Sequence, residues 1–114
     1  MTKSTPKTPG YTYAYGRRKS AIATVKLFPK DGDSTINGLS VTKYFASLSF
    51  KDKYLLPFTA TSTAGKYHFT ARVVGGGKNG QSQALVLALA RALRKINQET
   101  YTPLLRQFGL LTVD

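Results

Sequence analysis

The stretch that decides the fold is Tyr67–Ile96, which reads YHFTARVVGGGKNGQSQALVLALARALRKI. Residues 67–74 are rich in aromatic and β-branched side chains, which predicts a strand. The run Gly75–Gly80 cannot extend that strand, because its glycines favour tight turns and positive φ. From Gln81 the apolar residues recur with a helical period, which predicts a helix that ends near Ile96. The apolar stripe of this helix consists of Leu85, Leu89, Leu93 and Ile96, widened by Val86 and Ala92.

The glycine run has the chemistry of an anion-binding loop. Glycine lets a phosphate approach the backbone closely, and the N–H groups at the start of the following helix can then donate hydrogen bonds to it. Lys78 adds a full positive charge within the loop. The alternative interpretation is a tight connection that binds nothing, and both interpretations stay open when the loop is considered alone.

The same loop matches a dinucleotide-binding motif that the rest of the chain does not support. Gly75, Gly77 and Gly80 have the spacing GxGxxG between a predicted strand and a predicted helix. In that fold an acidic residue closes a second parallel strand, whereas Glu99 follows directly on the predicted helix. A P-loop requires Lys after its last glycine, where this chain has Gln81. We therefore reject both motifs.

The composition describes a small and strongly basic protein. The chain has 114 residues, which is enough for one domain. It carries 17 Lys and Arg against 5 Asp and Glu, so its formal net charge is +12 and its pI is about 10.2. A small domain this basic usually binds polyphosphate, so nucleic acid is the leading partner and an anionic membrane surface is the weaker alternative. We expect no membrane span, because no stretch approaches the ~20 apolar residues that one needs.

The sequence offers little for catalysis. It contains no cysteine, which excludes disulfides, thiolate metal sites and cysteine nucleophiles. His68 is the single histidine and lies within the predicted strand, so we expect it to pack on the sheet. Asp31 and Asp33 lie in a turn among cations and form no cluster that could hold magnesium. We predict that the protein is not an enzyme and has no cofactor and no metal site.

A second informative stretch is Tyr13–Ser20, YAYGRRKS, which concentrates cations and tyrosines beside a glycine. Arginine side chains bind phosphates with two donors, and tyrosine rings stack on unpaired bases. The stretch precedes a predicted strand over Ala21–Phe28, whose alternate residues form the core face. That face is Ala21, Ala23, Val25 and Leu27. We predict RNA contact here, and the alternative is a solvated charge run at the entrance of the strand.

We expect residues 1–12 to form a disordered N-terminal arm and residues 13–114 to form one domain. Between the two informative stretches, the pattern predicts a short strand over 34–36, a tight turn at Asn37-Gly38 and a helix capped by Ser40. The core residues expected from this region are Val41, Tyr44, Phe45 and Leu48, followed by Tyr54, Leu55 and Leu56.

After Ile96 the pattern predicts a short helix that is capped by Thr102, begun by Pro103 and closed at Gly109. We expect residues 110–113 to add an edge strand. The residues of the helix that we expect to face inward are Leu104, Leu105 and Phe108.

A set of motifs, in this order along the chain, resembles one family. They are GRRKSA at 16–21, ING at 36–38, YF at 44–45, VGGG at 74–77, GQ at 80–81, ARAL at 90–93 and FGLLT at 108–112. Together they are similar to small-subunit ribosomal protein nine of the bacterial type, and the resemblance spans about Tyr13 to Asp114.

The resemblance implies a fold and a function. The fold would be α+β, a two-layer α/β sandwich of the ribosomal protein S-five domain-two-like type, with a mixed sheet and helices packed on one face. The function would be that of a structural constituent of the small ribosomal subunit, which binds ribosomal RNA in the head near the decoding and peptidyl-tRNA site during translation. Neighbouring head proteins would be further partners, and the location would be the ribosome of the cytoplasm or of an organelle.

In that family, contact with peptidyl-site transfer RNA depends on a long basic C-terminal tail. This sequence stops at Asp114, where the tail would begin, so transfer-RNA contact would need that missing tail. Two alternatives to the ribosomal function remain, namely a nucleotide-binding enzyme that uses the Gly75–Gly80 loop and a free-standing basic nucleic-acid-binding module.

The predicted RNA-binding residues combine the basic and glycine positions that match the family with the cations of the predicted helices. They are Arg17, Arg18, Lys19, Ser20, Gly75, Gly76, Gly77, Lys78, Asn79, Gln81, Arg91, Arg94, Lys95 and Arg106.

Overall fold

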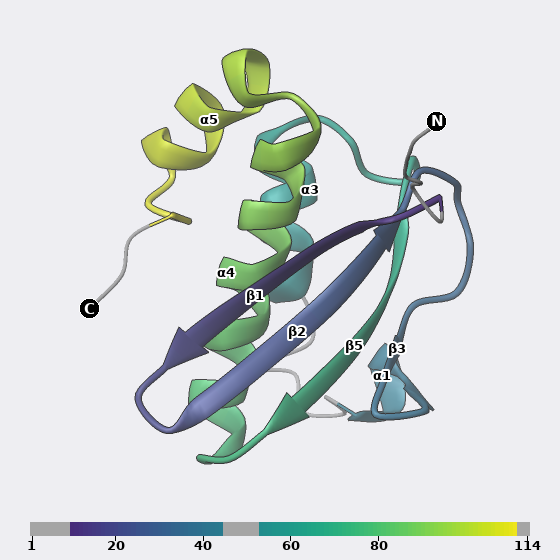
Figure 1. Ribbon diagram of the computed structural model, residues 1–114, viewed down its shortest axis with the longest axis vertical. Coiled ribbons are helices and arrows are strands. Elements are labelled where there is room, and N and C mark those ends of the chain that lie inside the picture. Colours follow the sequence, from purple (N-terminus) through teal and green to yellow (C-terminus); the bar gives the residue numbers. More distant parts are fainter. Residues whose placement is uncertain (1–9, 45–52, 112–114) are drawn as a thin grey trace, which may run out of the picture.

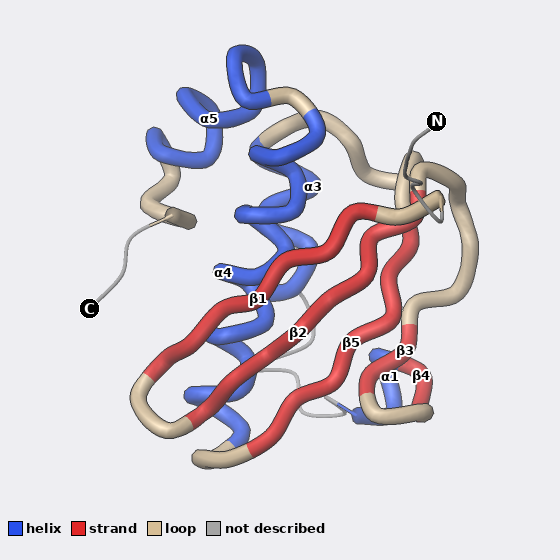
Figure 2. Tube along the Cα trace, viewed as in Figure 1, coloured by secondary structure: helices blue, strands red, loops and turns tan. Residues whose placement is uncertain are grey.

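The computed structural model describes residues 10–44 and 53–111. Its strands form one sheet in the order β1-β2-β5-β3-β4 (Figure 2). The strands are β1 (Thr12–Arg18), β2 (Ala21–Phe28), β3 (Thr35–Ile36), β4 (Leu39–Ser40) and β5 (His68–Val74). The helical segments are α1 (Val41–Tyr44), the 3-10 turn η1 (Lys53–Leu55), α3 (Leu56–Ala60), α4 (Lys78–Ile96) and α5 (Gln98–Gln107).

The sheet is mixed and the helices lie on one side of it. β2 pairs in antiparallel fashion with both β1 and β5, whereas β3 pairs with β5 in parallel. α4 packs across β1 and β2, and α3 lies on the same side of the sheet as α4 (Figure 1). The predicted α+β class, a two-layer α/β sandwich with a mixed sheet and helices on one face, is confirmed.

The core lies between β2 and α4, as the two periodic patterns predict. The residues that β2 turns toward the helix are all buried, namely Ala21, Ala23, Val25 and Leu27. Leu85, Leu89 and Leu93 of α4 are fully buried against them. Burial of each leucine contributes about 1.5–3 kcal/mol, so this stripe is a main source of stability.

Gly16 lets the edge strand β1 approach α4 closely. A Cβ atom at Gly16 would meet the carbonyl oxygen of Ala84 and lie 2.7 Å from the backbone nitrogen of Ala88. Both contacts are with helix backbone, which cannot turn away as a side chain can. The glycine is therefore required by strand–helix packing, and it makes no bend in the chain.

β1 is the largest feature that sequence reasoning missed. We expected Tyr13–Ser20 to be an entrance to the next strand, but Thr12–Arg18 is itself a strand that pairs along its length with β2. Its only buried residues are Ala14 and Gly16, while Tyr13, Tyr15 and Arg17 are exposed. Because these buried residues are small, the sequence shows no clear alternation of apolar and polar side chains, and the pattern did not predict a strand. The strand also begins at Thr12, one residue before the predicted domain boundary.

The helix boundaries differ from the predicted ones. α4 begins at Lys78, so Lys78, Asn79 and Gly80 belong to the helix and the loop is only Gly75–Gly77. At its other end Ile96 is exposed and lies outside the core. The pattern did not predict the first turn, because glycine and asparagine have low helix propensity. They are tolerated in the first turn, where the backbone N–H groups have no hydrogen-bond partner within the helix.

α5 also begins earlier than predicted, because a different residue caps it. The side chain of Asn97 accepts a hydrogen bond from the Thr100 backbone N–H at 3.1 Å, so the helix starts at Gln98. Pro103 then lies inside the helix, and Thr102 is not its cap. Leu105 is buried as expected, whereas Phe108 is 61% exposed.

Smaller corrections concern the middle and the end of the chain. Leu55 and Leu56 were expected to be buried, but both are exposed, and Pro57 lies in the first turn of α3. The Asn37-Gly38 turn is confirmed with positive φ at both residues, and it joins β3 to the unpredicted β4. Residues 110–111 lie in a turn, not an edge strand. The predictions for Phe45, Leu48 and residues 112–113 lie outside the described residues.

Ser40 contacts the start of α1 as predicted, with its Oγ 3.4 Å from the Lys43 backbone nitrogen. His68 packs on the sheet as predicted. Its ring stacks on that of Phe28 at a centroid distance of 4.8 Å, and its Nδ1 lies 2.7 Å from the carbonyl oxygen of Lys30.

Candidate nucleic-acid interface

The two stretches that the sequence marked as informative meet at one end of the sheet. The β1–β2 hairpin turns at Lys19 and Ser20, and the loop Gly75–Gly77 lies directly against this turn. A Cβ atom at Gly75 would collide with the carbonyl oxygen of Ser20, and one at Gly76 would lie 3.1 Å from Cβ of Ala21. Both glycines have positive φ, 78° and 60°. Their first role is therefore to close this corner of the fold.

A network of hydrogen bonds holds the glycine loop to the start of α4. The Gln81 side chain donates from Nε2 to the carbonyl oxygen of Gly75 at 3.0 Å. Its Oε1 accepts a hydrogen bond from the Tyr44 hydroxyl at 2.8 Å. The Lys78 ammonium lies 3.5 Å from the centroid of the Tyr44 ring, a cation–π contact. Gln81 and Tyr44 thus fix the loop, and Tyr44 also positions Lys78.

The Asn37 side chain attaches this network to β5. Its Nδ2 donates to the carbonyl oxygen of Val73 at 2.9 Å, and its Oδ1 accepts from the Val73 N–H at 2.9 Å. This paired contact replaces backbone pairing just where β3 ends. The last residues of β5 are therefore held on both sides before the chain enters the glycine loop.

Gly77 leaves the N-terminus of α4 open. It occupies the N-cap position with φ −99° and ψ 176°, an extended conformation that any residue can adopt. Among the described residues, a Cβ atom at Gly77 would meet nothing within 4 Å, so the space beside this N-cap is open in that part of the chain. The first turn, Lys78 to Gly80, contains no acidic residue, and Gly77 has no side chain to cap it. The backbone N–H groups and the positive end of the helix dipole therefore face a space that an anion can enter.

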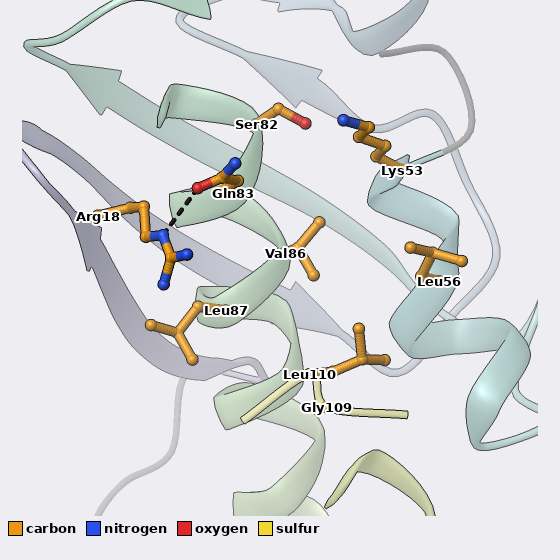
Figure 3. Close-up of a pocket in the computed structure, with 9 residues that line it drawn as sticks. All are labelled: Arg18, Lys53, Leu56, Ser82, Gln83, Val86, Leu87, Gly109 and Leu110. Atoms are coloured by element: carbon orange, nitrogen blue, oxygen red, sulfur yellow. Dashed lines mark hydrogen bonds between the residues drawn. The ribbon is translucent and has the colours of Figure 1, made fainter. Parts of the chain in front are cut away.

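The cations of the hairpin point in different directions. Arg17 is exposed on the sheet face opposite to the helices, and Lys19 is exposed in the turn with φ 56°. Arg18 lies on the helical side, where its Nε donates to Oε1 of Gln83 at 2.7 Å (Figure 3). There it lines a pocket with Lys53 and the apolar side chains Leu56, Val86, Leu87 and Leu110. Arg17 and Lys19 are thus the more accessible of the predicted phosphate contacts.

The cations of α4 beyond its first turns form a second group. Arg91 follows Lys78 by 13 residues, which is about 20 Å along a helix. Its Nη1 donates to the carbonyl oxygen of Tyr15 at 3.0 Å, and Nζ of Lys95 donates to that of Tyr13 at 2.6 Å. These two cations cover the outer edge of β1, which blocks pairing with another strand.

The remaining predicted residues are distributed as follows. Ser20, Asn79 and Gln81 lie at the corner where the hairpin turn meets the glycine loop. Arg94 is half-buried on α4, and Arg106 is exposed on α5. The structure therefore brings ten of the predicted residues together. The corner, which we name the hairpin–loop surface, consists of Arg17, Arg18, Lys19, Ser20, Gly75, Gly76, Gly77, Lys78, Asn79 and Gln81.

The list of candidate residues drawn from the sequence omits three residues that lie at charged or polar surfaces. Tyr44 was assigned only to the core, yet its hydroxyl and ring hold Gln81 and Lys78. Lys26 and Arg72 are exposed on the open face of the sheet, on neighbouring strands. The alternation of β2 did place Lys26 on the face opposite to the core, although it was not named as a binding residue, and the same alternation in β5 could have placed Arg72.

The geometry does not support a nucleotide-binding fold around GxGxxG. β5 pairs with β2 in antiparallel fashion, and Gly80 lies inside α4 instead of in a phosphate loop. Glu99 lies in the first turn of α5, directly after α4, and closes no strand. Within residues 10–44 and 53–111, no group of three or more His, Asp or Glu could hold a metal ion. Nor does any helix in these two ranges have the length and apolar character needed to cross a membrane.

The fold and the surface together define a small, strongly basic α+β domain with an open helix N-terminus at one corner of its sheet. Comparison with known proteins identifies the family to which this domain belongs. The sequence model of the family described as "Ribosomal protein S9/S16" matches residues 16–114. The chain belongs to this family.

Three similar proteins share one name. The chain is 44% identical over 101 residues to the "Small ribosomal subunit protein uS9" of Leifsonia xyli, covering 89% of this chain and 60% of that protein. It is 41% identical over 101 residues to the protein of the same name from Cutibacterium acnes, covering 89% and 58% respectively. With that of Thermotoga neapolitana it shares 40% identity over 108 residues, covering 92% and 79%. The chain thus spans about three fifths of the length of the first two relatives.

Proposed function

We propose that the chain is a structural constituent of the small ribosomal subunit that binds small-subunit ribosomal RNA and takes no part in catalysis. Membership of the ribosomal protein family supports this function, and the net charge of +12 suits a partner with a phosphate backbone. The alternative of a nucleotide-binding enzyme is not favoured, because the family consists of ribosomal proteins. A free-standing basic module is not favoured for the same reason.

The observation that carries the proposal is the joining of the hairpin turn and the glycine loop at the start of α4. Lys19 and Lys78 are exposed beside backbone N–H groups that face open space. An RNA phosphate that binds beside Gly77 would accept hydrogen bonds from those N–H groups and would be attracted by both cations. Such contacts fix position and register on the RNA backbone and carry no base specificity.

The finer assignments follow from the same proposal. The RNA would be that of the subunit head, near the decoding and peptidyl-tRNA site, and neighbouring head proteins would contact other faces of the domain. The location would be the ribosome, in the cytoplasm or in an organelle. Contact with peptidyl-site transfer RNA is proposed only for a basic tail of the kind that follows this domain in the family.

The salt dependence of RNA binding tests the hairpin–loop surface. The double variant Arg17→Gln/Lys19→Gln removes two exposed cations and leaves the Arg18–Gln83 hydrogen bond in place. Each lost phosphate contact should reduce the slope of log affinity against log salt by about 0.7–0.9, so the slope should fall by about 1.4–1.8. Affinity for a fragment of the small-subunit head RNA would be measured between low and moderate salt, with circular dichroism on the same samples.

The matched control is Lys30→Gln/Lys66→Gln, which removes the same charge from two exposed residues outside the hairpin–loop surface. It should leave the slope nearly unchanged. If a folded Arg17→Gln/Lys19→Gln variant has the slope of the unmodified chain, or if both variants lose the same amount, the hairpin is only a solvated charge run.

A further inference from the structure

The face of the sheet opposite to α4 is uncovered among the described residues. The helices of the described ranges lie on the other side of the sheet (Figure 1). Outer residues of all three long strands are exposed on the uncovered face, among them Tyr13, Lys26 and Arg72. None of these three strands contains an aspartate or a glutamate. The face is therefore free of negative side chains from its own strands.

Two exposed tyrosines stand on this face with cations on both sides. Tyr13 is 49% exposed and Tyr15 is 54% exposed, although both belong to a paired strand. Tyr13 pairs across the sheet with Lys26 of β2. Tyr15 pairs with Thr24, which pairs in turn with Arg72 of β5.

At the outer edge of β1 the cations come from α4. The guanidinium carbon of Arg91 lies 5.6 Å from the centroid of the Tyr15 ring, and Nζ of Lys95 lies 5.9 Å from that of Tyr13. Their hydrogen bonds to the β1 backbone hold both cations in place. The two rings thus lie between a pair of cations from the helix and a pair from the sheet.

We propose that this face, defined here as the tyrosine face (Tyr13, Tyr15, Lys26 and Arg72), binds an unpaired segment of RNA. The two rings would each stack on a base, and Lys26 and Arg72 would bind the phosphates alongside. The rings are two residues apart on one strand, a separation of about 6.8 Å, which leaves room for a base at each. The proposal rests on the proposed RNA-binding function but assigns a second surface, distinct from the hairpin–loop surface, and a different kind of RNA.

The chemistry favours unpaired RNA over the other polyanions. Aromatic rings stack on bases only where the bases are free, and a duplex buries its bases and presents phosphates and sugars. A hollow between Tyr13, Lys26 and Arg72 also lies on this face, with threonine hydroxyls at its wall. An acidic protein segment would contact the cations but would gain little from two adjacent tyrosine rings.

The test compares the double variants Tyr13→Leu/Tyr15→Leu and Tyr13→Phe/Tyr15→Phe. The probes are a single-stranded oligouridylate of about ten nucleotides, which is within the usual site size of single-strand binders, and an RNA duplex of the same length. The leucine variant should bind the single strand at least tenfold more weakly than the unmodified chain. The phenylalanine variant should stay within about twofold, because it keeps the rings. Duplex binding should change little in either variant.

A direct measurement on the unmodified chain accompanies the variants. Ring protons of Tyr13 and Tyr15 should shift upfield in NMR spectra when the oligouridylate binds, and the two phenylalanine substitutions assign them. The proposal is overturned if a folded leucine variant binds the single strand like the unmodified chain, if it loses single-strand and duplex binding equally, or if the ring protons do not shift.

These results separate the two claims. If the leucine variant is unaffected while Arg17→Gln/Lys19→Gln still flattens the salt slope with head RNA, only the tyrosine face is refuted. If the unmodified chain binds neither RNA probe nor the head fragment, the proposed function fails as well. Preference for an oligoglutamate peptide over oligouridylate would overturn the tyrosine face as an RNA site and would assign it to an acidic protein segment.

Discussion

Replacing Gly77 by aspartate should stabilise the folded chain and weaken its binding to RNA. Gly77 is the N-cap of α4, its φ and ψ suit any residue, and its surroundings are open. Aspartate there can accept a hydrogen bond from a first-turn N–H and favourably meet the helix dipole. Together with a smaller chain entropy in the unfolded state, these effects should add about 1 kcal/mol to the free energy of unfolding.

The carboxylate introduced by Gly77→Asp would lie in the space proposed for an RNA phosphate. Two unit charges about 6 Å apart repel by about 1–3 kcal/mol at a partly exposed site, which corresponds to roughly a 5- to 150-fold loss of affinity. Gly77→Asn is the matched control, since it caps the helix without adding charge. It should keep most of the gain in stability and lose less RNA affinity than the aspartate variant does.

Urea unfolding would give the free energy of unfolding, and fluorescence anisotropy with a head RNA fragment at about 0.1 M salt would give the affinity, because there the screening length is about 10 Å. The reasoning is refuted if the aspartate variant is folded and binds the RNA as tightly as the unmodified chain. It is also refuted if Gly77→Asp and Gly77→Asn lose affinity equally, since charge would then play no part.

Three further predictions concern the parts that hold the hairpin–loop surface in place. Gly75→Ala should lower the free energy of unfolding by about 2 kcal/mol or more, because φ is 78° and the new Cβ would collide with Ser20. A loss below about 0.5 kcal/mol, which is ordinary for a surface substitution, would contradict this prediction. Asn37→Ala removes both hydrogen bonds to the Val73 backbone and should cost about 1–3 kcal/mol in urea unfolding. A free energy of unfolding equal to that of the unmodified chain would show that these two bonds do not stabilise the end of β5. Tyr44→Phe removes the hydrogen bond to Gln81 and should cost about 1 kcal/mol while the ring still contacts the lysine; an unchanged midpoint would show that the hydroxyl contributes nothing.

Strong periodic patterns made the centre of the fold predictable. The apolar stripe of α4 and the alternation of β2 each repeat with the period of their element, so their buried residues could be identified without the structure. β1 could not be identified, because its inward residues are Ala14 and Gly16 and its exposed ones are aromatic or charged. Its pairing with β2 and the close packing of Gly16 on α4 together explain why such a strand is stable.

The candidate surface was predictable as a list of residues but not as an arrangement. The sequence indicated the hairpin and the glycine loop separately, and it offered no reason why Ser20 should touch Gly75. Nor could it show that Arg91 and Lys95 hold the edge of β1, since those hydrogen bonds join residues far apart in the chain. Such long-range contacts depend on tertiary packing, which local patterns do not encode.

The most direct test of the central claim is an NMR titration of the isotopically labelled chain with a fragment of small-subunit head RNA, following every backbone amide. The account predicts that the largest chemical-shift changes fall on residues 17–20 and 75–81, where the hairpin turn, the glycine loop and the first turn of α4 meet. Changes confined to α5, around Arg106, with these amides unmoved at saturating RNA, would contradict it.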